Sequence, residues 1–156
     1  MRAPSSIRPE GGFTTVEMMV VVLIVAILSM LAVPSMRDMI RNQRIKTASF
    51  DVFAGLVLAR SEALKRNSSV TLAPNGGDWT NGWVATDALT NVVARQDPFQ
   101  AGSVAVAGPG SITFNASGRL AAGGDLTISA PDLPTTSYRC IKIDLSGRPF
   151  SKQGVC

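Results

Sequence analysis

The stretch that decides the fold is residues 12–34, GFTTVEMMVVVLIVAILSMLAVP. From Phe13 to Val33 it contains a single charged residue, Glu17. A helix rises about 1.5 Å per residue, so this segment would span about 31 Å, the thickness of a bilayer's hydrocarbon core. We therefore predict a transmembrane helix. Glu17 needs an explanation, because a carboxylate costs about 2.5–3.5 kcal/mol at mid-bilayer and less toward the interface.

The residues before the apolar segment indicate its orientation. Residues 1–12 contain two arginines and one glutamate, so the positive-inside rule keeps them in the cytoplasm and translocates the chain after Pro34. An ordinary secretory signal has a shorter apolar region and a small-residue cleavage site after it, and Ala32-Val33-Pro34 is a poor site. An uncleaved signal anchor is the alternative, but it leaves Glu17 unexplained.

Composition limits the chemistry that the chain can perform. Its 156 residues carry a net charge of +4 and include no histidine, which excludes a histidine base or ligand. Without residues 1–12 the charge is +3, which is only weak support for an anionic partner. In a translocated domain, Cys140 and Cys156 are expected to form a disulfide worth about 3 kcal/mol. Two cysteines without histidine make a poor metal site, so no metal or cofactor is expected.

The rest of the chain indicates one long helix followed by short strands. Apolar residues continue at helical spacing after Pro34, so the helix is expected from about Thr14 to Lys65, with its first half in the bilayer and its second half amphipathic. Gly55 within it suggests close approach of a strand. From Val70 the period changes to two, and strands are expected at 70–73, 82–86, 92–95, 104–106, 112–114, 126–129 and 139–145. The fold class is therefore α+β, with an antiparallel meander in one or two small sheets covering the amphipathic half of the helix.

Two tryptophans, one arginine and two glycines are expected to have structural roles in the fold. Trp79 and Trp83 are expected to pin a hairpin to the helix, since tryptophan buries a large area. Arg60 is expected to pair with a strand carbonyl or an acid. Gly118 and Gly147 each precede an arginine after a strand, which is typical of a turn.

Four segments narrow the class of protein to which the chain can belong, when they are taken together with the N-terminus and in this order. They are Leu58–Asn67, Asp78–Trp83, Phe114–Arg119 and Cys140–Arg148. With Gly-Phe ahead of the apolar run and glutamate four residues after the phenylalanine, the chain resembles the GspH/FimT-type minor pilins and pseudopilins of the type IV filament superfamily. The resemblance runs through nearly the whole chain.

This resemblance implies a type IV pilin-like fold with a leader at 1–12, a transmembrane and assembly helix at 13–34, and a periplasmic globular domain at 35–156. A prepilin peptidase would cut between Gly12 and Phe13, and the new N-terminus would be methylated. Glu17 would pair with the Phe13 amine of the next subunit and set the axial register. The chain would cross the inner membrane once, with its N-terminus cytoplasmic, before entering a pilus or pseudopilus.

The resemblance also implies a structural role. The expected function is that of a type IV pilus minor pilin that primes assembly and lies at or near the filament tip. Its partners would be other minor and major pilins, the prepilin peptidase and the inner-membrane assembly platform. A type II secretion pseudopilin is the alternative, although the cysteine pair favours the pilus. No catalytic residues are expected, because histidine is absent and the loop Asn75–Asp78 lacks the lysine of a phosphate loop.

A second hypothesis is DNA binding during DNA uptake. Some FimT-type minor pilins are implicated in uptake through a C-terminal Gly-Arg-x-Arg motif, and here Gly147-Arg148 matches while Phe150 occupies the place of the second arginine. Basic and aromatic side chains suit phosphate contact and base stacking on single-stranded or duplex DNA. A solvated basic loop is the structural alternative. The candidate residues are Arg139, Lys142, Arg148, Phe150 and Lys152.

Overall fold

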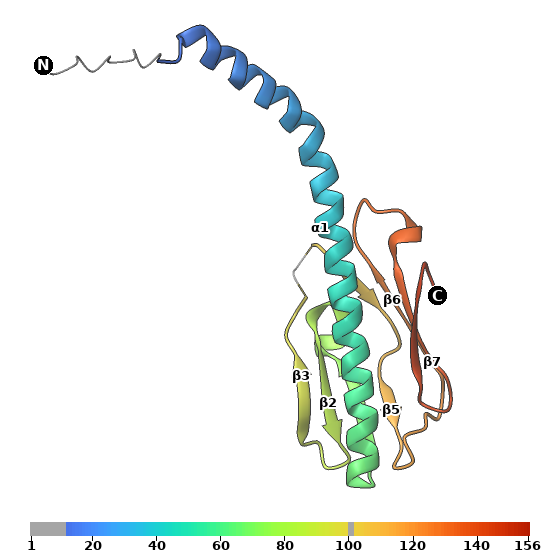
Figure 1. The fold of residues 1–156 in the computed structure, drawn as a ribbon. Helices are drawn as coiled ribbons and strands as arrows, with labels where there is room; N and C mark the ends of the chain where they lie inside the picture. The colour runs from blue at the N-terminus through green and yellow to red at the C-terminus, as the bar shows by residue number, and fades with distance from the viewer. Residues whose placement is uncertain (1–11, 100–101) are drawn as a thin grey trace, which may run out of the picture. The chain divides into compact units, whose positions relative to one another are not determined.

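The computed structural model describes residues 12–99 and 102–156, and its internal contacts divide the chain into two compact units, Met1–Arg37 and Asp38–Cys156. Helix α1 (Thr15–Arg66) supplies the helical residues of both units (Figure 1). Its bounds differ by one residue at each end from those predicted. The helix ends in a Schellman motif, in which Asn67 adopts a positive φ and the Ser68 amide donates to the Ala63 carbonyl at 3.2 Å.

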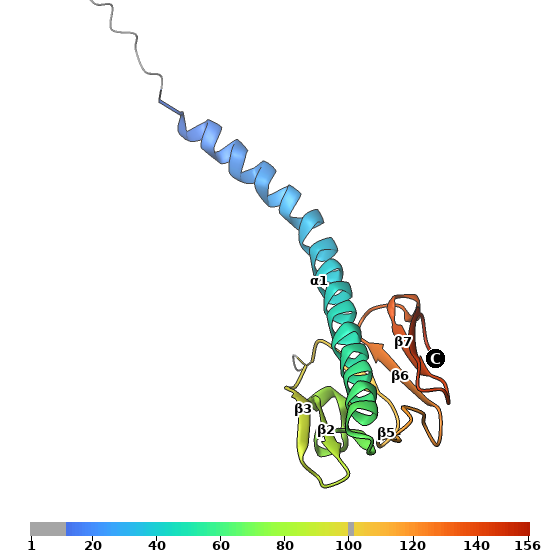
Figure 2. The ribbon, with the colours of Figure 1, turned by 60° about the horizontal axis from the view of Figure 1, so that its bottom comes forward.

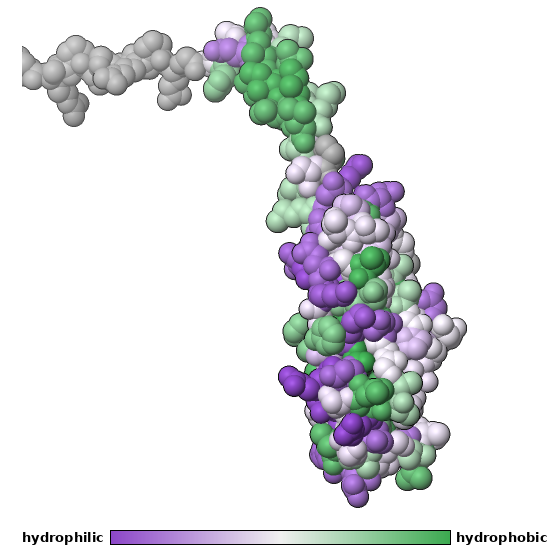
Figure 3. Space-filling view, turned by 90° about the vertical axis from the view of Figure 1, so that its right-hand side faces the viewer, coloured by the Kyte–Doolittle hydropathy of each residue, from purple (hydrophilic) through white to green (hydrophobic). Residues whose placement is uncertain are grey.

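The described part of the first unit, residues 12–37, is an exposed apolar helix with its short lead-in. Its large apolar side chains are exposed from Phe13 to Val33, and Figure 3 shows them as a nearly continuous apolar surface. By length and composition, α1 is apolar enough to cross a membrane. The predicted leader, apart from Gly12, lies outside the described residues.

The second unit has its own hydrophobic core, built on one face of α1 and two four-stranded sheets. Residues buried on α1 recur at intervals of three or four, as an amphipathic helix requires: Ile45, Ala48, Val52, Leu56, Ala59 and Ala63. The first sheet has the order β3-β2-β1-β5 and the second has the order β4-β6-β7-β8. Figure 2 shows strands of the two sheets on either side of this half of the helix.

The strands are short and all pair antiparallel. The first sheet comprises β1 (Val70–Pro74), β2 (Trp83–Asp87), β3 (Val92–Gln96) and β5 (Ile112–Phe114). The second comprises β4 (Ala105–Ala107), β6 (Gly124–Ser129), β7 (Arg139–Ile143) and β8 (Pro149–Gln153). Three 3₁₀ turns connect them, η1 (Asn75–Gly77), η2 (Trp79–Asn81) and η3 (Thr135–Ser137).

The predicted meander is wrong at Gly108-Pro109-Gly110. Strands β4 and β5 flank this segment but belong to different sheets: β4 pairs with β6, and β5 pairs with β1. The segment is therefore a crossover and not a hairpin turn. The Trp79 indole N–H holds it by donating to the Pro109 carbonyl at 2.7 Å. A period of two predicts which side chains face the core, but it does not identify the partner strand.

The C-terminal segment also differs from the prediction. Residues 149–153, predicted as part of a basic loop, form strand β8 at the edge of the second sheet. Its residues are mostly exposed, so they show none of the apolar alternation that reveals a half-buried strand. Pro149 occupies its first position, where the missing N–H is tolerated.

Two similar turns lie against the helix. They read Asn115-Ala-Ser-Gly-Arg119 and Asp144-Leu-Ser-Gly-Arg148, and their glycines have φ values of 69° and 78°. In each turn the first side chain accepts a hydrogen bond from the amide four residues later. Arg60 links them, donating from Nε to the Gly118 carbonyl at 3.1 Å and from Nη2 to the Ser146 carbonyl at 3.2 Å. The prediction that Arg60 pairs with a backbone carbonyl is thus confirmed. The carbonyls belong to two turns, however, and not to a strand.

Candidate functional site

The start of α1 forms the first candidate site. Thr14 and Glu17 make a reciprocal capping box, because the Glu17 amide donates to Thr14 Oγ1 at 3.2 Å while Glu17 Oε2 accepts from the Thr14 amide at 2.9 Å. Thr14 Oγ1 also lies 3.0 Å from Glu17 Oε2. The carboxylate therefore has a local partner within the single chain. Glu17 Oε1 makes no hydrogen bond with residues 12–99 or 102–156.

The predicted cleavage point lies just ahead of this cap. Gly12 has open space around its Cα, and Phe13 is 83% exposed. Gly12, Phe13 and Glu17 thus lie within one exposed stretch of chain. Cleavage at the predicted point would place the Phe13 amine one residue before the N-cap residue Thr14.

The second candidate site is the C-terminal hairpin, formed by β7 and β8. The structure joins Cys140 and Cys156 in a disulfide with a Cα–Cα distance of 5.0 Å, which agrees with the prediction. Cys140 is fully buried. The bond fixes the last residues of the chain against the outer side of the second sheet, where Cys156 Sγ contacts the Leu126 carbonyl oxygen at 3.3 Å.

The predicted DNA-binding residues do not form one cluster. Arg139 pairs with Ile128 and Gln153, so it shares the sheet face that is turned toward α1. Lys142, Phe150 and Lys152 lie on the opposite face, because Lys142 pairs with Phe150 and Cys140 pairs with Lys152. Arg148 is exposed in the turn between the two strands. The prediction of one basic loop is therefore wrong, since the alternation of two paired strands divides the cations between two faces.

Local acids further reduce the positive charge of the outer face. Lys142 forms an ion pair with Asp125 of β6 at 3.2 Å. Because this acid is distant in sequence, the local charge pattern does not predict the pair. The Arg148 amide donates to Asp144 Oδ1 at 3.1 Å. Hydrogen bonds from the Ser146 hydroxyl and from this amide hold the pKa of Asp144 below its ordinary value. Among these five residues, Lys152 and Arg148 are the exposed cations that make no ion pair with the described residues.

A groove that sequence reasoning missed lies between α1 and strand β8. It has a volume of about 540 Å³ and is lined by eight residues: Lys46, Ser49, Phe50, Phe53, Arg139, Pro149, Phe150 and Ser151. These residues come from α1 and from the β7–β8 hairpin, which are far apart in sequence, so no single sequence motif indicates the groove. The available signal was the pair of phenylalanines at helical spacing, Phe50 and Phe53, of which Phe50 is 71% exposed. No group of three or more potential metal ligands occurs among residues 12–99 and 102–156.

The comparisons with known proteins agree with this architecture. The chain belongs to the family described as type II transport protein GspH, which matches residues 49–147. Members of this family are filament subunits, so the chain is a structural protein of the pilin and pseudopilin class and not an enzyme. A comparison with curated proteins finds no match.

Two solved structures show the same fold. The type IV minor pilin FimU of Pseudomonas aeruginosa is 23% identical with a TM-score of 0.61, and the match covers 70% of this chain and 89% of that one. The minor pseudopilin EpsH from the type 2 secretion system of Vibrio cholerae is 12% identical with a TM-score of 0.57, covering 70% of this chain and 97% of that one. At these identities the likeness concerns the fold.

Proposed function

We propose that the chain is a minor pilin of a type IV pilus, which joins other minor pilins in a complex that primes assembly at or near the filament tip. The observation that carries the proposal is the exposed N-terminal stretch of Gly12, Phe13 and Glu17 ahead of an apolar helix, in a chain of this family. An exposed helix of this kind can be buried only by lipid or by the helices of neighbouring subunits.

Glu17 carries the axial contact in this proposal. Its Oε2 caps its own helix through Thr14, and Oε1 is available for the Phe13 amine of a neighbouring subunit. Such pairing converts a costly carboxylate in lipid into an ion pair. The subunit would start as a single-pass inner-membrane protein with a cytoplasmic N-terminus and a periplasmic globular unit. The prepilin peptidase and the assembly platform would act on it before it enters the filament.

The experiment is to express the chain and two variants in cells that lack the native gene, and then to analyse membranes and sheared pili. Gly12→Val should leave residues 1–12 attached and prevent incorporation. Glu17→Val should insert in the membrane normally but should be lost from the pili. Thr14→Val is the matched control, since it removes the hydroxyl contacts with Glu17 and keeps both the carboxylate and the amide of residue 14. A mature chain that still begins at Met1, or Glu17→Val subunits at normal levels in pili, would contradict the proposal.

A type II secretion pseudopilin is the second candidate, favoured by the description of the matching family. Loss of the gene would then abolish export of secreted enzymes and leave piliation unchanged. The minor-pilin role requires the reverse. Assaying both phenotypes in one deletion strain separates the two functions.

DNA binding is a third candidate, and the observation that favours it is the exposed outer face of β8. Phe150 is 49% exposed there and neighbours Lys152, with Arg148 in the adjoining turn. Arg148→Gln and Lys152→Gln should each weaken binding to single-stranded DNA, and added salt should weaken it steeply. Arg139→Gln is the matched control on the other face. Absence of binding at low salt in a fluorescence titration of the purified chain would eliminate this role.

A further inference from the structure

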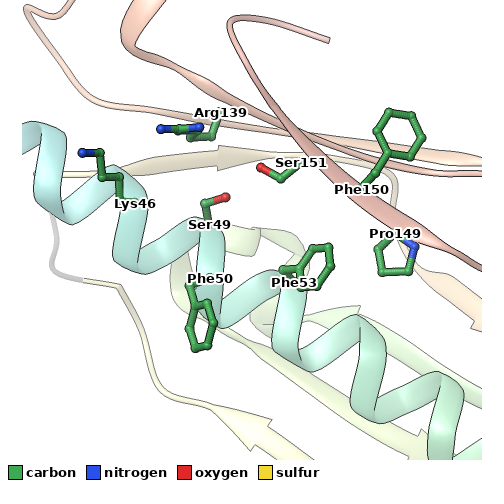
Figure 4. A pocket seen from close by; sticks show the side chains of 8 residues that line it. All are labelled: Lys46, Ser49, Phe50, Phe53, Arg139, Pro149, Phe150 and Ser151. Carbon is green, nitrogen blue, oxygen red and sulfur yellow. The ribbon is translucent and has the colours of Figure 1, made fainter.

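The groove between α1 and β8 is lined by both apolar and polar groups. Figure 4 shows Ser49 and Phe53 of the helix turned toward Ser151 and Pro149 of β8, whereas the ring of Phe50 points away from that strand. The ring of Phe150 lies on the other side of that strand, as the alternation along β8 requires. An adjoining polar hollow shares Lys46 and Arg139 with the groove and adds Asn42, Ser137 and Gln153. The two hollows meet at Lys46 and Arg139, and we refer to them together as the trough.

Strand β8 presents unpaired backbone groups along this trough. The Gly154 amide donates to Tyr138 and the Asp144 amide to Arg148, so the ladder bonds between β7 and β8 involve the even-numbered residues. In an antiparallel pair the residues between such bonds point their amides and carbonyls away from the partner strand. Ser151 and Gln153 therefore direct their backbone groups outward, from an edge that no described strand covers. Pro149, which has no N–H to donate, also falls on this outward series.

The charges along the trough are all of one sign. Lys46 on the helix and Arg139 on β7 form no ion pair with residues 12–99 or 102–156, and none of the residues lining either hollow is acidic. Some cations of the same unit are paired, as Arg41 is with Asp132 and Lys142 with Asp125, whereas Arg148 and Lys152 are exposed and unpaired among the described residues. A bound molecule with a carboxylate could form charge-assisted hydrogen bonds with Lys46 and Arg139.

We propose that the trough binds an extended, acidic segment of a neighbouring pilin subunit, which adds to β8 as a further antiparallel or parallel strand. The outward backbone groups of Ser151 and Gln153 would hold the segment's main chain. Phe53 and Pro149 would contact its apolar side chains, and Lys46 and Arg139 would bind its carboxylate. The identity of the occupant as a pilin rests on the proposed function, whereas the chemistry of the trough does not.

An extended peptide fits these features better than a nucleic acid does. Addition of a strand to an exposed edge uses main-chain hydrogen bonds for affinity and side-chain pockets for specificity, and the trough offers both. A nucleic acid would use the two cations for its phosphates, but it would leave the outward amide–carbonyl series of β8 without its matching partner.

The test uses the full chain purified in detergent micelles. The probe is a fluorescent peptide that alternates valine and threonine around a central glutamate, and the reference is the same peptide with glutamine. The glutamate peptide should bind about tenfold more tightly than the glutamine peptide, because hydrogen bonds to charged groups are the stronger ones. Amide hydrogen exchange at Ser151 and Gln153 should slow when the peptide is bound.

Three variants locate the binding. Lys46→Gln combined with Arg139→Gln should remove the preference for glutamate, and Ser151→Pro should weaken both peptides because it deletes an outward N–H without breaking the β7–β8 ladder. Lys152→Gln is the matched control, since it removes one charge from the opposite face of the same strand and should change nothing. The melting temperature of each variant shows that the chain has remained folded.

The outcomes separate the alternatives. Failure of the glutamate peptide to bind at about 1 mM, or binding that Ser151→Pro leaves unchanged in a folded chain, overturns the proposal. Binding of single-stranded DNA that the Lys46 and Arg139 variants weaken more than peptide binding would identify a nucleic-acid site instead. Peptide binding is measured without a filament, so its failure would leave the minor-pilin role intact. Absence from pili would likewise leave the peptide result intact.

Discussion

The indole of Trp83 lies directly against Gly55 of α1, so that a Cβ built on Gly55 would overlap the benzo ring of the tryptophan. Trp83 is 4% exposed, and it is the first residue of β2 in the first sheet. A glycine inside a helix costs about 1 kcal/mol relative to alanine. Here the missing side chain allows the strand to approach, as the sequence suggested.

Gly55→Ala should therefore destabilise the globular unit although it improves helix propensity. Overpacking of a rigid buried ring costs about 1–3 kcal/mol, which exceeds the propensity gain. Urea unfolding of the variant measures the difference. Ala54→Gly, at the exposed neighbouring position, is the propensity control and should cost about 1 kcal/mol.

A double-mutant cycle checks the assigned cause. Trp83→Phe removes the ring that meets position 55, so Gly55→Ala should cost less in that background than in the native one. Equal costs in the two backgrounds would show that the contact between Gly55 and Trp83 does not explain the glycine.

Reduction of the Cys140–Cys156 disulfide should lower the free energy of unfolding by about 3 kcal/mol, as loop-closure entropy predicts for a bond with a sequence separation of 16. The last residues should then exchange their amide protons faster, since the bond ties them to buried Cys140. Unfolding with and without reductant measures the first effect. Mass spectrometry of unreduced protein that found two free thiols, or an unchanged unfolding midpoint after reduction, would contradict this expectation.

The sequence predicts the elements of the fold better than their connections. Hydrophobic period locates the second half of α1 and strands β1 and β2, because each has a buried face whose residues recur at the helical or strand interval. It does not assign β4 and β5 to different sheets, since that choice depends on contacts such as the one between Trp79 and Pro109. It also misses β8, because an exposed edge strand has little apolar alternation to detect.

The candidate sites show the same division. The processing and assembly residues are adjacent in sequence, so a short motif is enough to suggest them, and their roles stay predictions. The basic residues near the C-terminus are also adjacent, but the pairing of β7 with β8 places Arg139 on the opposite face from Lys152. The trough combines Lys46 with Arg139 across 93 positions of sequence, and only the fold brings them together.

The turn anchored by Asp144 should make stability depend on acid pH. Its carboxylate accepts hydrogen bonds from the Ser146 hydroxyl and the Arg148 amide, and these lower its pKa in the folded state. A depressed pKa stabilises the fold above the unfolded-state value of about 3.9 and loses that contribution as the pH falls through the folded-state pKa.

Asp144→Asn should consequently reduce stability at neutral pH and flatten its decline below about pH 4, because the variant has no proton to take up at this position. Ser146→Ala should flatten the decline partly, since it removes the largest of the interactions that lower the pKa. Urea midpoints measured across the acid range give both slopes. A slope in Asp144→Asn as steep as that of the native chain would assign the acid sensitivity to other carboxylates.

The final prediction concerns Arg60, which holds two turns against the helix through the carbonyls of Gly118 and Ser146. One turn connects β5 of the first sheet with β6 of the second, and the other connects β7 with β8. Arg60 therefore stabilises the junction at which both turns meet α1. Arg60→Gln should leave both partly buried carbonyls short of a donor. Each hydrogen bond to a charged group contributes about 1.5–3 kcal/mol, so the loss of both should cost about 3–6 kcal/mol.

Lys65→Gln is the control for Arg60→Gln. Lys65 lies on the same helix and pairs with Glu62 at 3.2 Å, but its side chain is 75% exposed. Exposed ion pairs contribute about 1 kcal/mol or less, so this variant should unfold at nearly the native urea concentration. If the two variants lose the same stability, the carbonyl contacts of Arg60 contribute no more than a surface pair, and the junction must depend on its apolar core. If Arg60→Gln alone unfolds early, the arginine is the polar link that fixes both turns to α1.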